Sequence, residues 1–148
     1  MKILDYILCE DIREEVGRKL TLVGTFHDQI VFHQTKDHQV KWPVTLRLAI
    51  YLKVMFEETD QFDSLNVFFI EEKSGVELFK LAPSLPPDLK KNAPVLLNFV
   101  LQNIQISAPT ELTLRIEGIK NGNITATITP ELQYKVSLKE EGKDVVVS

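Results

Sequence analysis

The chain has 148 residues, of which 44% are hydrophobic and 26% charged, a composition typical of a soluble globular protein. Its net charge is −4 and its longest basic run is Lys90-Lys91, so a nucleic-acid partner, which needs clustered cations, is disfavoured. Cys9 is the only cysteine, which excludes an internal disulfide and a thiolate metal cluster and favours a reducing compartment. Lys53 interrupts the longest apolar stretch, so no membrane span is expected. We expect one cytoplasmic domain over residues 1–148.

The first segments have the patterns of strands. Residues 3–9 are apolar on both faces apart from Asp5, which predicts a strand that is covered on both sides for most of its length. Residues 19–26 alternate between apolar and polar side chains, and residues 29–33 continue as a further strand after a bend.

The polar segment between the first two strands has the signals of a short helical turn. Asp11 and Glu14 have the spacing of a capping box, and the glycine three residues later can end the turn. We predict that Asp11 caps this turn and that Arg13 pairs with a carboxylate such as that of Glu10 or Glu15.

Residues 44–56 alternate without a break, and only a β-strand places alternate residues on opposite faces. One face of this long strand is therefore expected to lie on the core. The core-facing residues are Val44, Leu46, Leu48, Ile50, Leu52, Val54 and Phe56.

Residues 65–71 and 76–81 predict a hairpin with Gly75 in its turn. Residues 82–94 hold four of the seven prolines, which cannot donate to a strand ladder, so this segment is predicted to be a crossover loop. After residues 95–101 the apolar alternation changes phase, and a bulge near Gln102-Asn103 is the simplest cause.

Asn121-Gly122 is a strong hairpin signal. An unbroken register around this turn would set Ile116 opposite a threonine. A bulge at Gly118 instead turns Ile119 inward opposite Ile124 and sets Ile116 against Ile128.

Residues 132–138 predict another strand, and residues 144–147 a short edge. Nine or ten short strands without crossover helices predict an all-β fold, and we expect a two-sheet antiparallel β-sandwich of immunoglobulin-like or C2-like type.

One N-terminal motif is specific enough to compare with a known family. It comprises Tyr6-Ile7-Leu8-Cys9-Glu10-Asp11-Ile12-Arg13-Glu14-Glu15, Gly17, and Lys19-Leu20-Thr21-Leu22-Val23-Gly24-Thr25-Phe26. This motif resembles the opening of a bacterial family known only as a domain of unknown function, which has a strand ending in Cys-Asp, an Ile/Val-Arg-x-Glu turn, Gly-Lys and a Thr-Leu-Ile-Gly strand. The resemblance spans most of the chain, since residues 99–115 are similar to the family's penultimate strand pair, although Pro109-Thr110-Glu111-Leu112 replaces a Pro-Gly-x-Tyr corner. It implies a β-sandwich and no known activity.

The three histidines, His27, His33 and His38, fall within twelve residues and suggest a metal site. In a strand, however, His27 and His33 would lie about 20 Å apart, whereas ligands of one Zn²⁺ lie within about 2.1 Å of it. We therefore interpret all three histidines as solvated surface residues and predict no metal site.

The acidic loop of Glu57, Glu58, Asp60 and Asp63 lacks the glycine and ligand spacing of a calcium loop, so a solvated turn is favoured. Cys9 has apolar neighbours and is expected to be a buried thiol. The sequence contains no nucleophile elbow and no phosphate loop. We accordingly predict no catalytic residues, no cofactor and no enzymatic activity.

Two functional hypotheses remain. The first is a non-catalytic subunit or adaptor that acts through protein contacts or self-association. The second is a ligand- or glycan-binding module centred on Trp42, although a Trp that caps the end of the core is at least as good an interpretation. The weak surface candidates are Trp42, His27, His33, His38 and Arg13. Residues 144–147 suggest a tail strand that pairs within its own sheet or with a second copy in a homodimer.

Overall fold

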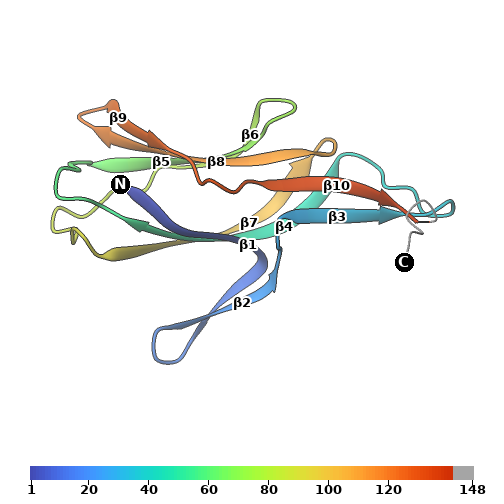
Figure 1. Cartoon of the computed structure of the whole chain (residues 1–148), viewed down its shortest axis with the longest axis horizontal. Coiled ribbons are helices and arrows are strands. Elements are labelled where there is room, and N and C mark those ends of the chain that lie inside the picture. Colours follow the sequence, from blue (N-terminus) through green and yellow to red (C-terminus); the bar gives the residue numbers. More distant parts are fainter. Residues whose placement is uncertain (142–148) are drawn as a thin grey trace.

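The computed structural model describes residues 1–141 and shows a β-sandwich of two facing sheets (Figure 1). The first sheet has four strands in the order β2-β1-β4-β7, and the second has six, in the order β3-β10-β8-β5-β6 with β9 paired to β8. The all-β, two-sheet prediction is confirmed. The strands are β1 (Lys2–Glu15), β2 (Lys19–Thr25), β3 (Gln29–Gln34), β4 (Val44–Met55), β5 (Ser64–Glu71), β6 (Val76–Leu81), β7 (Pro94–Ile106), β8 (Thr110–Lys120), β9 (Asn123–Ile128) and β10 (Tyr134–Glu140).

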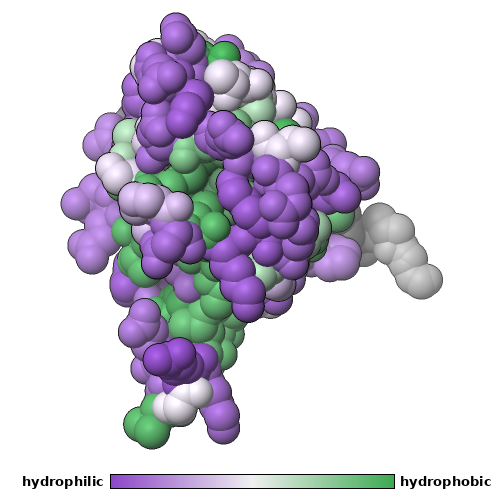
Figure 2. Space-filling view, turned by 90° about the vertical axis from the view of Figure 1, so that its left-hand side faces the viewer, coloured by the Kyte–Doolittle hydropathy of each residue, from purple (hydrophilic) through white to green (hydrophobic). Residues whose placement is uncertain are grey.

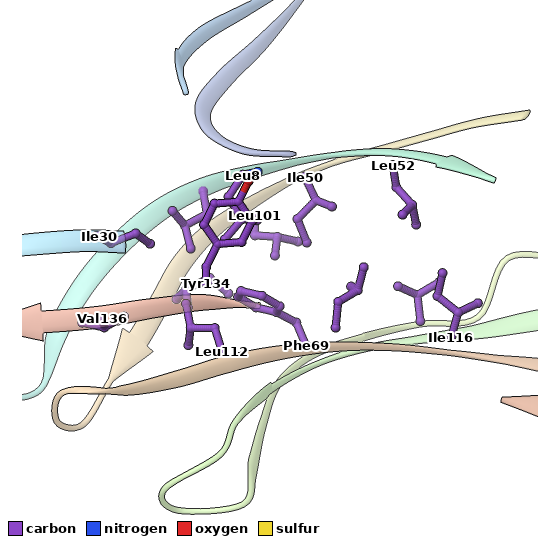
Figure 3. Close-up of a cluster of buried hydrophobic side chains, with 14 of the residues drawn as sticks. Leu8, Ile30, Ile50, Leu52, Phe69, Leu101, Leu112, Ile116, Tyr134 and Val136 are labelled. Atoms are coloured by element: carbon purple, nitrogen blue, oxygen red, sulfur yellow. Dashed lines mark hydrogen bonds between the residues drawn. The ribbon is translucent and has the colours of Figure 1, made fainter. Parts of the chain in front are cut away.

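The core lies between the two sheets. In Figure 3, Leu8, Ile50 and Leu52 of the four-stranded sheet point toward Phe69, Leu112 and Ile116 of the six-stranded sheet. All six side chains are fully buried. The predicted core face of residues 44–56 is confirmed, because its central members from Leu48 to Phe56 are at most 1% exposed.

The local features that set the strand register in β7 are those predicted. The β4–β7 register shifts between Leu46 and Leu48, which pair with Ile104 and Leu101, so two residues of β7 oppose one of β4. The bulge therefore falls at Gln102-Asn103, and Asn103 takes a positive φ of 59°.

The β8–β9 hairpin also has the predicted pairing. Ile116 pairs with Ile128 and Ile119 with Ile124 across a register shift at Gly118. The second pair is only partly covered, because Ile119 is half-buried whereas Ile124 opposite it is 58% exposed. This pair lies at the end of the hairpin, beyond the core cluster.

The helical turn predicted after residue 9 is wrong. β1 continues to Glu15 and pairs antiparallel with β2, and the reversal falls at Gly17 and Arg18, which have φ values of 85° and 60°. Asp11 makes a tertiary contact in place of the predicted helix cap: its carboxylate accepts a hydrogen bond from Arg47 at 3.0 Å. Six residue pairs with β2 give the backbone of β1 more partners than one helical turn would.

Two further details differ from the sequence analysis. The pairing of β3 with β10 is parallel, so the sandwich is mixed rather than wholly antiparallel. β10 begins at Tyr134, and Leu132, which was expected to start this strand, is 80% exposed. The predicted edge strand at 144–147 lies outside the described residues. Within residues 1–141 there is no helix, and thus no helical segment able to cross a membrane.

Candidate interaction surface

The first half of β1 has a strand on one side only. β4 pairs with β1 from Lys2 to Cys9, whereas β2, on the opposite side, pairs only from Cys9 to Glu15. The side of β1 that faces away from β4 therefore has no paired strand before Cys9, and we call the part of this side over residues 2–6 the free edge. The sequence predicted that residues 3–9 are covered on both faces for most of their length, with Asp5 as the exception. Asp5 is exposed, but so is Leu4, at 45%, which the prediction did not foresee.

Two hydrogen bonds show which backbone groups point toward the free edge. The Leu8 amide donates to the Tyr134 hydroxyl at 3.1 Å, and the Leu8 carbonyl accepts from the Phe26 amide at 3.0 Å, so neither group is directed at β4. Backbone groups alternate in direction along a strand. Since the register is unbroken between Leu8 and Tyr6, the Tyr6 amide and carbonyl also point away from β4, where no other strand follows within residues 1–141.

A groove of about 500 Å³ runs along the free edge. Residues 1–6 form one wall, and residues 128–132, which connect β9 to β10 in the other sheet, form the opposite wall. Leu4 and Leu132 are large apolar side chains exposed on these walls. Lys2, Asp5 and Glu131 add charges of both signs. The groove thus presents unpaired backbone next to apolar side chains.

Tyr6, which lines the groove, packs against a second tyrosine, Tyr134. The rings of Tyr6 and Tyr134 meet edge to face, with their centroids 5.3 Å apart. The buried Tyr6 hydroxyl has no hydrogen-bond partner among the described residues. Burial raises the pKa of Tyr6, with a smaller contribution from Tyr134, and burial likewise raises the pKa of Tyr134. Both hydroxyls therefore remain neutral at physiological pH and act as dipoles rather than charges.

The second half of β1 and all of β2 form a two-stranded arm that projects from the sandwich (Figure 1). A second groove, of about 350 Å³, lies where the arm meets the outer face of the four-stranded sheet. Its apolar lining residues are Ile7, Leu20, Leu22, Tyr51 and Leu96. Seen from the side that holds the N-terminus, hydrophobic surface extends from the middle of the molecule onto the arm (Figure 2). Asp5 lines both grooves, so the two are adjacent.

The weak surface candidates lie outside the free-edge groove. Trp42 packs edge to face on Phe32 with the ring centroids 5.7 Å apart and adjoins the core cluster. The three histidines are exposed near β3 and the loop after it. The carboxylate closest to Arg13 is that of Asp11, 3.7 Å from its Nε, rather than Glu10 or Glu15. Among residues 1–141, no group of three or more His, Cys, Asp or Glu side chains could hold a metal ion.

The acidic loop has a structural contact that the sequence analysis did not foresee. Asp60 accepts a hydrogen bond from the Met1 ammonium at 2.5 Å and another from the Glu57 amide at 2.8 Å, and Lys91 donates to the Asp60 carbonyl. Partial burial acts to raise the pKa of Asp60, but these hydrogen bonds and the nearby positive charges hold it below its usual value. The loop thereby anchors the start of β1 beside the groove.

Cys9 is fully buried and its thiol donates to the carbonyls of Asp11 and Ala49 at 3.3 and 3.7 Å. Burial raises the pKa of this thiol, so it has little of the thiolate form that a nucleophile requires. The buried thiol expected from its apolar neighbours is confirmed.

Sequence reasoning missed the free edge because it arises from unequal strand lengths. β1 has 14 residues and β2 has 7, so β2 can accompany only half of β1. A sequence signal that could have revealed the free edge is the short segment between the turn at Gly17 and the bend at residues 27–28, because this segment limits the length of β2.

Comparison of the chain with protein-family models, with curated proteins and with solved structures gave no match. The function must therefore be argued from the geometry of the surface.

Proposed function

We propose that this chain is a protein-interaction module, a subunit or adaptor, which binds an extended segment of a partner along the free edge of β1. The observation that supports it is the unpaired backbone of Tyr6 beside a groove with exposed Leu4 and Leu132. An open sheet edge of this kind recruits a strand by main-chain hydrogen bonds, while side-chain contacts on the two faces select its sequence.

Two features of the free edge restrict which segments can pair there. The register of β1 with β4 shifts between Ile3 and Asp5, so the strand is bulged and twisted at this point. Charged side chains stand at both ends of the edge, at Lys2 and Asp5. Bulges and charges are the devices by which proteins discourage indiscriminate edge pairing. A matching partner must follow the bulge and complement both charges.

The glycan-binding alternative gains no comparable support. A sugar platform requires an open aromatic face, and Trp42 packs its ring against Phe32 at the edge of the core. We therefore place the interaction at the free edge rather than at Trp42.

Selection of heptapeptides from a random displayed library tests this proposal. The wild-type chain is compared with Leu132→Glu, which puts a charge on the groove wall at a position already 80% exposed, and with Val16→Glu, a control at the arm tip that is 96% exposed. We expect related peptides to be selected by the wild type and by Val16→Glu and to lose binding to Leu132→Glu at least tenfold. Selected peptides that bind all three proteins equally would overturn the proposal.

A further inference from the structure

We infer that the segment taken up by the groove is the C-terminal end of a second copy of this chain, residues 142–148, so that two copies exchange these segments. This assignment rests on the proposed strand-binding role of the free edge and names its partner.

The composition of the segment suits an edge-pairing strand. It reads Gly142-Lys143-Asp144-Val145-Val146-Val147-Ser148, with three adjacent β-branched residues and no proline. β-Branched side chains favour an extended backbone. An added strand in a sheet is covered on both of its faces, so valines on either face of the strand would be buried. The exposed Leu4 and Leu132 supply apolar partners in the groove.

The segment cannot bring its valines to the groove of its own chain. β10 leads away from the groove, and its last residues lie beside β3, where the Glu141 amide donates to the Gln34 carbonyl at 2.9 Å. Figure 1 shows the C-terminal end of β10 on the opposite side of the molecule from the N-terminus. The six steps from Tyr134 to Glu140 span about 20 Å. Val146 lies only five residues beyond Glu141, a reach of about 17 Å even without the required reversal of direction.

A two-fold axis across the long dimension of the sandwich would close the exchange. The groove and the end of β10 lie at opposite ends of the molecule. Both are next to the same side of the sandwich, on which β3 is the edge strand of one sheet and the free edge of β1 belongs to the other. Such an axis brings each C-terminal segment to the groove of the other copy, so both contacts form at once and the assembly closes as a dimer.

Direction and charge agree with this arrangement. β1 and β10 both start at the groove end and run toward the opposite end (Figure 1). After the two-fold rotation, a segment that continues the direction of β10 is antiparallel to the partner's β1, as β4 is to β1 in the sheet. Antiparallel docking brings Lys143 toward the Asp5 end of the groove and sets Val145, Val146 and Val147 along the more apolar residues that precede it.

The oligomeric state of four chains in solution tests the exchange. Light scattering after gel filtration, from micromolar to millimolar concentration, should show a concentration-dependent dimer for the full chain and for Val16→Glu. Removal of residues 143–148 should give a monomer, and Leu132→Glu should weaken the dimer at least tenfold.

A truncated chain that dimerises like the full chain, or a full chain that stays monomeric at every concentration, would overturn the assignment of residues 142–148. These results leave the strand-binding role to be decided by peptide selection, in which the truncated chain still offers its groove. If peptides are selected there with dependence on Leu132, only the partner is wrong. If they are not, the proposed function fails as well.

Discussion

Leu48 and Leu114 lie on opposite sheets and are at most 1% exposed, so each tests which face of its strand forms the core. A charge buried at either position without a partner costs more than the few kcal/mol by which a domain of this size is stable. We predict that Leu48→Asp and Leu114→Asp each abolish cooperative folding, whereas Thr45→Asp, at an exposed position of β4, does not. A thermal melt of either core variant within about 3 °C of the wild type, the shift for about 1 kcal/mol, would contradict the assignment.

Gly118 tests whether the β8 bulge needs a residue without a side chain. A Cβ atom placed there would lie 2.4 Å from Cε1 of Phe62, which is far inside contact distance. We predict that Gly118→Ala destabilises the fold by about 1–3 kcal/mol, as expected for overpacking. Combining it with Phe62→Leu should recover part of this loss in chemical denaturation. A double variant whose losses simply add would show that the ring is not the obstacle.

Asp60 gives the fold a defined dependence on pH. Its pKa is lowered in the folded chain, so its ionised form stabilises the fold above the unfolded-state pKa of about 3.9, and the stabilisation is lost as the pH falls through the lower folded value. Asp60→Asn should therefore be less stable than the wild type near pH 6, and the difference should shrink on acidification below about pH 4. Urea denaturation across this range measures it, and a difference that stays constant would contradict the role of the carboxylate.

At the scale of elements, the arm formed by β2 and the end of β1 is a ribbon of two strands, each with a neighbouring strand on one side only. A two-stranded ribbon is marginally stable in water, whereas β4 has a neighbour on each side. We predict that amides of the arm, such as those of Ile12 and Leu22, exchange with solvent at least tenfold faster than those of Ile50 and Leu52. Exchange as slow in the arm as in β4 would mean that the arm is stabilised by contacts outside the chain.

Local patterns predicted much of this element structure. The alternation of residues 44–56 set the faces of β4, and Asn121-Gly122 with Gly118 set the pairing of the last long hairpin. These signals depend on neighbours in sequence, so they can be read without the fold. The turn expected at Asp11 failed because its capping signal was overridden by a distant residue, Arg47. The parallel pairing of β3 with β10 joins residues over 100 positions apart and has no local signal.

The candidate surface was less predictable than the fold. The sequence analysis singled out Trp42 and the histidines by residue type, but the structure places Trp42 against Phe32 and the histidines on exposed loops and edges. The groove instead depends on where β2 ends relative to β1 and on how the β9–β10 connection passes over the gap. No single residue marks such a surface, because it is a property of two sheets whose strands differ in length.

At the scale of the whole molecule, one side of the sandwich, the side with β3, differs between its two halves. β3 covers the half beside β10, while the half beside Lys2–Tyr6 has the groove in place of a strand. An added strand would extend the four-stranded sheet, bury Leu4 and Leu132, and satisfy the backbone of Tyr6. A strand bound at the free edge would therefore give residues 2–6 of β1 a hydrogen-bonded neighbour on both sides.

The amide exchange rate of Tyr6 tests this central claim most directly. Two-dimensional NMR at the lowest workable concentration should show the Tyr6 amide exchanging rapidly, while its neighbour Ile7, directed at β4, is protected. Raising the protein concentration, or adding a peptide selected on the groove, should slow exchange at Tyr6 and leave Ile7 unchanged. A Tyr6 amide already protected in the dilute chain, or one whose exchange rate does not change when the partner binds, would contradict the account.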